Sequence, residues 1–211
     1  EQYADHLPHL YTIRTDFQTA GRGQAGNSWE SEAGKNLLFS TLLRYQGILA
    51  SQQWRLSMLV AVALWDTLAK HLPQDKLSIK WPNDIYYGDK KLVGILIENS
   101  LSGAYVGYTI VGIGINVNQT TFPSSLPNPT SILLEKSYSA PTPDKNPEAP
   151  LDLKLLLQQF HEIYSEYYYD YISDKSNFPG THENSRIPGD NSSKTKLEVL
   201  DQHFRFKLLN L

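Results

Sequence analysis

The segment between residues 77 and 117 constrains the fold most, because it alternates apolar runs with residues that favour turns. The apolar runs cover residues 77–81, 85–87, 91–98 and 104–117. Glycine-containing dipeptides at 88–89 and 102–103 separate the later runs, and short connections of this kind join antiparallel neighbours. Pro82 ends the first run because proline has no amide proton to donate to a strand ladder. The segment predicts a short strand followed by three consecutive antiparallel strands.

Two amphipathic patterns flank this segment. Residues 53–72 carry apolar side chains at the three- and four-residue spacing of a helix with one buried face, and Pro73 ends the pattern. Residues 151–172 repeat that spacing after a proline-rich linker, residues 139–150, which has too little apolar surface to form an element. Together these features predict an α/β (α+β) fold in which helices pack on a largely antiparallel sheet.

The length of the chain suits one domain with a small appendage, since it has 211 residues. We expect residues 1–172 to form the larger domain and residues 173–211 a small C-terminal segment. That segment is polar until residue 196, and a closing hairpin is expected over residues 197–209. It is too short to build a core of its own.

Residue usage excludes several classes of protein. A hydrophobic fraction of 40% rules out a disordered chain, and no apolar run is long enough to cross a bilayer. The net charge is -3 and the basic residues are scattered, so the electrostatic footprint of a nucleic-acid-binding protein is absent. The chain has no cysteine, which removes disulfides and thiolate chemistry. We therefore expect a cytoplasmic protein that binds neither nucleic acid nor membrane.

A glycine-rich segment, GRGQAGNSW at residues 21–29, carries the first candidate chemistry. Gly21, Gly23 and Gly26 match the spacing of a dinucleotide-binding fingerprint, but that fingerprint needs a helix beginning at the glycines. The polar residues that follow argue against such a helix, so we reject this interpretation. What remains is a loop that can approach an anion closely, with Arg22 as a bidentate donor for phosphate or carboxylate. An ordinary surface loop is an equally good interpretation of this segment alone.

Two further segments place unusual residues in or beside strands. KWPND, at residues 80–84, sets Lys80 at a strand end close to Asp84, which offers a cation and a ligand for Mg²⁺ within one turn. An edge-strand lysine with a capping aspartate is the alternative. In GIGINVN, at residues 112–118, glycines alternate with apolar residues, and such glycines indicate the close approach of a ligand or another backbone. One face of this strand is a candidate pocket floor, with a β-bulge as the alternative.

Four motifs stand in one order along residues 18–118: GRGQAGNSW, KWPNDI, KLVGILIE and GIGINVN. In that order, and at these approximate intervals, they resemble the biotin protein ligases, which attach biotin to a lysine of a carrier domain in biotin-dependent carboxylases. The resemblance is to the short form of the family, without a DNA-binding domain. It implies a mixed sheet flanked by helices, related to class II aminoacyl-tRNA synthetases, followed by an SH3-like barrel that is short or incomplete here.

The resemblance also implies the reaction. Such a ligase uses ATP, with Mg²⁺, to activate biotin as biotinyl-5'-AMP and then transfers it to a specific lysine of a biotin carboxyl carrier domain. Lys80 would hold the biotin carboxylate, and Arg22 would close over the phosphate. Asp84 would support Mg²⁺ or the acceptor lysine. Catalysis of this kind depends on positioning and on stabilising the negative charge that gathers at each step.

The resemblance assigns the remaining site residues to two groups. The biotin-binding residues would be Gln18, Arg22, Gly23, Gln24, Lys80, Gly94, Gly112 and Gly114. The nucleotide-binding residues would be Gly21, Arg22, Gly26, Trp29, Asn83 and Asn116. Gln24 departs from the family pattern, which most often has a second arginine there. The loss of that charge predicts weaker retention of the adenylate.

Two other functions stay open at this point, and the sequence assigns no oligomeric state. One is a lipoate or octanoate ligase of the same fold, which the tryptophan-containing motifs GRGQAGNSW and KWPND argue against. The other is a non-catalytic ligand-binding module. A decayed site should lose at least one of its charges, so convergence of Arg22 and Lys80 on one cleft would favour an enzyme.

Overall fold

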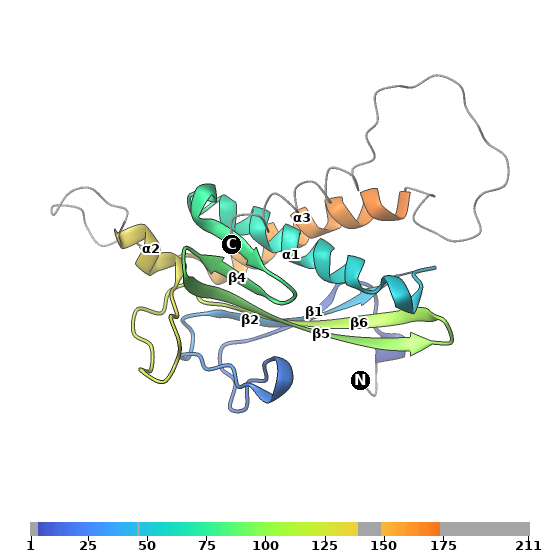
Figure 1. The fold of residues 1–211 in the computed structure, drawn as a ribbon, viewed down its shortest axis with the longest axis horizontal. Helices are drawn as coiled ribbons and strands as arrows, with labels where there is room; N and C mark the ends of the chain where they lie inside the picture. The colour runs from blue at the N-terminus through green and yellow to red at the C-terminus, as the bar shows by residue number, and fades with distance from the viewer. Residues whose placement is uncertain (1–3, 46, 139–148, 174–211) are drawn as a thin grey trace, which may run out of the picture.

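The protein is described by a computed structural model that covers residues 4–45, 47–138 and 149–173. Six strands form a single sheet (Figure 1): β1 (Tyr11–Thr15), β2 (Leu37–Arg44), β3 (Leu77–Lys80), β4 (Asp84–Tyr87), β5 (Lys90–Ser102) and β6 (Tyr105–Ile115). Their order across the sheet is β1-β2-β6-β5-β4-β3, and each neighbouring pair is antiparallel. The predicted α/β class with a largely antiparallel sheet is confirmed.

The predicted run of antiparallel strands is also confirmed, since β4, β5 and β6 are consecutive neighbours. Their turns contain Gly88 and Gly103, whose φ angles of 58° and 60° lie in the left-handed region that favours glycine. The strand β5 extends four residues beyond its predicted end at Glu98. It does so because its pairing with β6 continues to Ser102 and Tyr105.

The sequence analysis missed β1, β2 and the short helix α2 (Ile132–Tyr138). The strand β2 lies between β1 and β6, and six of its eight residues are buried. A strand covered on both faces shows no alternation of polar and apolar residues, so its sequence lacks the usual periodic signal. The strand β1 is an exposed edge of five residues, too short and polar to be recognised.

Both predicted long helices are present, with shifted ends. The helix α1 (Trp54–Ala69) stops before Pro73, and α3 (Leu153–Ser173) begins after Asp152, whose carboxylate accepts a 2.8 Å hydrogen bond from the amide of Lys154. Both helices lie on the same side of the sheet (Figure 1). The central part of α1 is buried there, which leaves the opposite side of the sheet for the loop between β1 and β2. Single-turn 3₁₀ helices complete the fold: Ala4–His6, Gln24–Gly26, Ala50–Gln52 and Gln74–Lys76.

Aromatic and polar side chains attach α3 to the first strands. The hydroxyl groups of Tyr45 and Tyr164 share a buried hydrogen bond of 2.5 Å. The ring of His9 stacks on that of Tyr168 at 4.2 Å, and the Nε2 atom of His161 lies 3.1 Å from the Thr12 hydroxyl. Tyr164, Tyr168 and Tyr171 thus pack against the domain, as amphipathic spacing predicts, whereas Tyr169 is exposed.

The two histidines at this interface predict a pH dependence of stability. Burial lowers the pKa of both His9 and His161 below the ordinary value of 6.5. Below that pH the unfolded chain binds more protons than the folded protein, so folding loses stability as the pH falls from 6.5 towards the lowered pKa values. We expect the free energy of unfolding, measured with urea, to decrease over this window and to be independent of these groups above it. A His9→Gln/His161→Gln variant should have a flatter profile, and an equal slope in both proteins would contradict the assignment.

Two sequence expectations fall on segments outside the described residues. The C-terminal segment 173–211, with its predicted hairpin at 197–209, is one of them, apart from Ser173 at the end of α3. Most of the predicted linker at 139–150 is the other. Within the described ranges, every helix is either too short or too polar to traverse a lipid bilayer.

Candidate active site

The loop between β1 and β2 contains the glycine-rich segment and lies on the open side of the sheet (Figure 1). Its tip is a single 3₁₀ turn, Gln24–Gly26, rather than the start of an α-helix. The amide of Gly23 donates to the Asn27 carbonyl oxygen at 2.6 Å, and the Asn27 side chain donates to the Gln24 carbonyl oxygen at 2.9 Å. The absence of an α-helix here agrees with the rejection of a dinucleotide fingerprint.

The indole of Trp29 lies directly on two glycines of the sheet. Gly94 on β5 and Gly114 on β6 are paired across the strands. A Cβ atom built on Gly94 would lie 2.6 Å from the Trp29 ring, and one built on Gly114 would lie 2.4 Å from it. No side chain larger than hydrogen fits at either position while the ring stays there. The pocket floor expected from the glycine pattern is therefore present, and the group that approaches it closely is Trp29.

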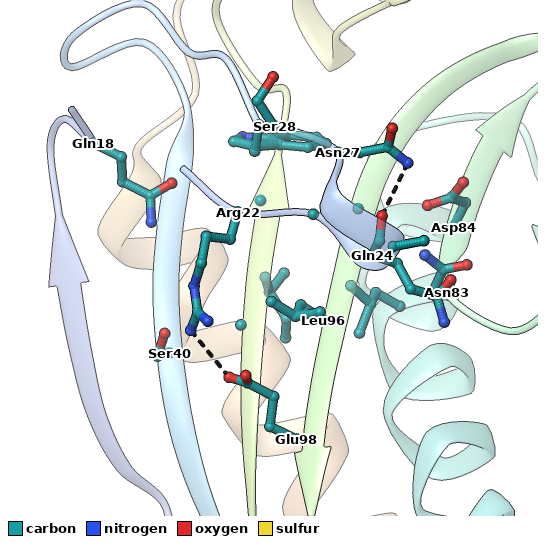
Figure 2. Close-up of a pocket in the computed structure, with 18 of the residues that line it drawn as sticks. Gln18, Arg22, Gln24, Asn27, Ser28, Ser40, Asn83, Asp84, Leu96 and Glu98 are labelled. Atoms are coloured by element: carbon teal, nitrogen blue, oxygen red, sulfur yellow. Dashed lines mark hydrogen bonds and ion pairs between the residues drawn. The ribbon is translucent and has the colours of Figure 1, made fainter. Parts of the chain in front are cut away.

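A cavity of about 740 Å³ lies between this loop and the sheet. Arg22 and Lys91 both line it, each beside a carboxylate. Figure 2 shows Arg22 extending from the loop to Glu98 on β5, at a distance of 3.3 Å. The Lys91 ammonium lies 2.7 Å from the Asp84 carboxylate and 5.9 Å from the centroid of the Trp29 ring. Two cations from separate elements thus face one cavity.

Ten of the sequence-predicted site residues line this cavity: Gln18, Arg22, Gly23, Gln24, Trp29, Asn83, Asp84, Gly94, Gly112 and Gly114. Those that do not are Lys80, Gly21, Gly26 and Asn116. Gly21 still has a structural need for glycine, because a Cβ atom there would lie 2.3 Å from the Trp29 carbonyl oxygen. Gly26 has a φ of 81°, which favours glycine in the turn.

The structure does not bring Lys80 to the cavity. Its side chain is exposed at the end of β3, with the ammonium 4.9 Å from the centroid of the Tyr86 ring. The lysine that reaches the cavity is Lys91, which the sequence analysis did not single out although it opens the KLVGILIE motif. Arg22 and Lys80 therefore do not converge on one cleft, as we expected for an enzyme. The cleft still contains two cations, because Lys91 lies there with Arg22.

A β-bulge explains the orientation of Lys91. The pairing of β4 with β5 shifts between Ile85, opposite Val93, and Tyr86, opposite Lys91, so that Leu92 is an extra residue. Regular alternation would put Lys91 on the same face as Val93 and Ile95, which are buried in the core. The extra residue Leu92 reverses the alternation of side chains across the bulge, so Lys91 faces the cavity.

A second cavity, of about 710 Å³, lies on the other side of the loop. It shares Gln18 and Trp29 with the first cavity but has two further aromatic walls, Phe17 and Phe122. No lysine, arginine or histidine is among its lining residues. The two cavities thus differ in chemistry: the first has cations beside carboxylates, and the second has aromatic walls with Glu30 and Glu32 but no cation. The Trp29 loop borders both.

Asn116 lies just beyond the end of β6 and is buried. Its amide donates to the Leu92 carbonyl oxygen at 3.0 Å, and its own carbonyl accepts from the amide of Ile132 at 3.1 Å. Its side-chain oxygen is buried without a hydrogen-bond partner among the described residues. A buried acceptor of this kind requires explanation, and a bound ligand that donates a hydrogen bond would supply one.

The described ranges contain no cluster of three or more His, Asp or Glu residues that could hold a metal ion. Asp84, the sequence-predicted Mg²⁺ ligand, is engaged by Lys91. Because Mg²⁺ commonly binds through substrate phosphates and only one or two carboxylates, these residues fit an ion that arrives with a nucleotide better than a resident one.

Comparison with known proteins identifies the family. The profile of the Biotin/lipoate A/B protein ligase family matches residues 6–116. A biotin--[acetyl-CoA-carboxylase] ligase of Paracoccus denitrificans is 45% identical over 102 residues, which cover 47% of this chain and 41% of that protein. The bifunctional ligase/repressor BirA of Escherichia coli (strain K12) is 36% identical over 123 residues, 58% of this chain and 37% of that protein. The chain thus spans about two-fifths of the length of these relatives.

The fold is shared with a solved structure. A biotin protein ligase from Aquifex aeolicus, in complex with biotin and ATP, matches with a TM-score of 0.61 and 27% sequence identity. The match covers 82% of this chain and 67% of that one.

Proposed function

The chain belongs to the Biotin/lipoate A/B protein ligase family, and from this premise we propose that it is a biotin ligase that activates biotin with ATP and transfers it to a lysine of a carrier domain. The observation that carries the proposal is the convergence of Arg22 and Lys91 on one cavity. Biotin has a carboxylate and ATP has phosphates, so joining them requires cations that offset the charge of both reactants.

Two chemical steps follow from the nature of the reactants. In the first, a biotin carboxylate oxygen attacks the α-phosphorus of ATP, the bond to the β-phosphate breaks, and pyrophosphate leaves. In the second, a neutral lysine amine of the carrier attacks the acyl carbon of this anhydride and AMP leaves. Lys91 would hold the carboxylate in line with the phosphorus, and Arg22 would stabilise charge on the phosphate oxygens.

The resting ion pairs support this assignment. Arg22 and Lys91 are paired with Glu98 and Asp84, so the cavity is close to neutral before substrates bind. An incoming carboxylate or phosphate would replace or share these partners. The pair between Arg22 and Glu98 is exposed and therefore weak, which leaves Arg22 free to exchange partners.

The second cavity is the proposed nucleotide subsite. Phe17, Phe122 and Trp29 offer apolar and aromatic surface for a flat base, while the first cavity holds the charged groups that phosphates need. Asn116 lines neither cavity, so its unpartnered side-chain oxygen is not part of this assignment. Mg²⁺ would enter with ATP, bound mainly by its phosphates.

Two alternatives from the same reasoning are a lipoate or octanoate ligase and a non-catalytic binding module. The Paracoccus denitrificans relative and the solved structure named above are biotin ligases, which supports biotin as the acid. A non-catalytic module that binds the same anions would also need cations, so catalysis of exchange is what distinguishes an enzyme from it. The localisation in the cytoplasm and the absence of nucleic-acid partners remain predictions from the sequence.

Exchange of labelled pyrophosphate into ATP tests the first step without a carrier. We expect exchange that depends on biotin and is much slower with lipoate or octanoate. Equal rates with all three acids would reject the specificity, and no exchange with any of them would reject the enzyme. Mass spectrometry of a biotin carboxyl carrier domain after incubation with biotin and ATP tests the second step.

The uncharged side chain of Gln24 should shorten the time for which biotinyl-5'-AMP stays bound to the protein. A glutamine donates a neutral hydrogen bond to the phosphate, whereas arginine would donate a charged one, and the difference is about 1 kcal/mol or more. We therefore expect Gln24→Arg to slow the release of preformed biotinyl-5'-AMP by roughly tenfold at fixed salt. Equal release rates in the two proteins would mean that the loop backbone retains the intermediate.

A further inference from the structure

Two buried amide side chains connect the Trp29 loop to the segment after β6. Asn36 and Gln119 are 0% and 4% exposed, although they are polar. The Asn36 side-chain nitrogen donates to the Gln119 side-chain oxygen at 2.5 Å, and the Asn36 side-chain oxygen accepts from the amide of Val117 at 2.9 Å. Asn36 also donates to the Ser31 hydroxyl at 2.9 Å. This single residue therefore links the loop, the start of β2 and the end of β6.

Gln119 extends the same network to the rim of the second cavity. Its side-chain oxygen accepts a second hydrogen bond, 3.1 Å long, from the amide of Glu32, and its side-chain nitrogen donates to the Thr121 carbonyl oxygen at 2.8 Å. The orientation of this amide is fixed by its neighbours, since a reversed amide would place its nitrogen against two donors. Ser31, Glu32, Gln119 and Thr121 all line the second cavity.

We propose that Gln119, oriented by Asn36, is a positioning residue that sets the width of the second cavity and thereby the affinity for the nucleotide. This inference rests on the proposed function, because it assigns the second cavity to ATP. Residues 30–32 of the loop after Trp29 form one wall of that cavity, and residues from the segment 119–123 form another. Within the described residues, the Gln119 side chain bonds directly to both walls.

The physical reason for the effect is the cost of a broken buried network. If Gln119 loses its amide, the Glu32 amide and the Asn36 side chain lose their acceptor, and buried donors without partners are unfavourable. The two walls would then separate to admit water. The first cavity should change much less, because its floor is made by β5 and β6 rather than by this network.

A matched pair of variants separates positioning from stability. Gln119→Leu removes the link between the walls at similar side-chain size. Asn118→Leu removes a comparable pair of hydrogen bonds: the Asn118 side chain accepts from the Leu151 amide at 2.8 Å and donates to the Leu151 carbonyl oxygen at 2.9 Å. Asn118 lines neither cavity. We expect both substitutions to lower Tm. Only Gln119→Leu should weaken binding of a non-hydrolysable ATP analogue, by about tenfold. The Kd of Gln119→Leu for biotin should change less than twofold. Titration calorimetry measures both affinities.

Equal weakening of both ligands by Gln119→Leu, or the same loss of ATP affinity in Asn118→Leu, would overturn the inference in favour of a merely structural role. A wild-type protein that binds neither ligand would refute the proposed function instead. In that case hydrogen exchange of the Glu32 amide still tests the hydrogen-bond network. We expect this exchange to be slow in the wild type and fast in Gln119→Leu. Equal exchange rates would overturn the inference. Gln119→Asn, which keeps the amide but is one carbon shorter, serves if Gln119→Leu does not fold.

Discussion

Replacement of Lys91 with methionine is expected to lower biotin-dependent pyrophosphate exchange by on the order of 10² or more. This is the scale for removing one preorganised charge from a reacting centre. The ammonium lies in the cavity beside Asp84 and Trp29, where methionine can fill similar space without charge. The effect should appear mainly in kcat, because the charge is needed most when the carboxylate attacks the phosphate.

Lys80→Met is the matched control, because Lys80 is exposed and lies outside the cavity. We expect it to keep exchange within a few-fold of the wild type. Lys91→Met also leaves the Asp84 carboxylate, only 15% exposed, without its cation, which costs stability. Asp84→Asn removes that cost, so a folded Lys91→Met/Asp84→Asn variant that is far less active than Asp84→Asn alone attributes the loss to Lys91. Wild-type exchange in Lys91→Met together with a large loss in Lys80→Met would restore the assignment made from the sequence.

Gly114→Ala should produce the second large effect, by expelling the Trp29 ring from the sheet. The added Cβ would lie 2.4 Å from the indole, far inside van der Waals contact. Overpacking of this kind costs about 1–3 kcal/mol, which corresponds to roughly ten- to a hundredfold in affinity if the displaced ring disturbs the cavity. Titration with biotin and exchange assays measure the loss.

The control for this prediction is Gly107→Ala on the same strand. A Cβ atom there would meet nothing closer than 3.5 Å, and Gly107 lines neither cavity. We expect it to bind biotin as the wild type does. In a Trp29→Ala background the clash is absent, so Gly114→Ala should then have little further effect. Additive losses from Trp29→Ala and Gly114→Ala would show that the glycine acts by some other route.

Local sequence patterns were sufficient to locate the long helices and the tight turns. The helix α1 has the apolar spacing of a helix, although the expected single buried face is wrong, because residues 58–65 are all buried. The turns at Gly88 and Gly103 require backbone conformations that glycine adopts readily. These features are properties of neighbouring residues, so they could be recognised without the fold. The strand β2 could not, because burial on both faces removes the alternation on which recognition depends.

The sequence by itself determined the glycine-rich loop, the pocket floor on β6 and the family to which its motifs belong. Only the tertiary structure decided which lysine enters the cavity. Lys80 ends the short strand β3 and Lys91 lies at the start of the long strand β5, but nothing in their immediate neighbours shows which of them faces a cavity. The bulge at Leu92 arises from the pairing of β4 with β5, and it turns Lys91 towards Asp84. The direction of a side chain at a bulge depends on the partner strand, which a linear pattern does not contain.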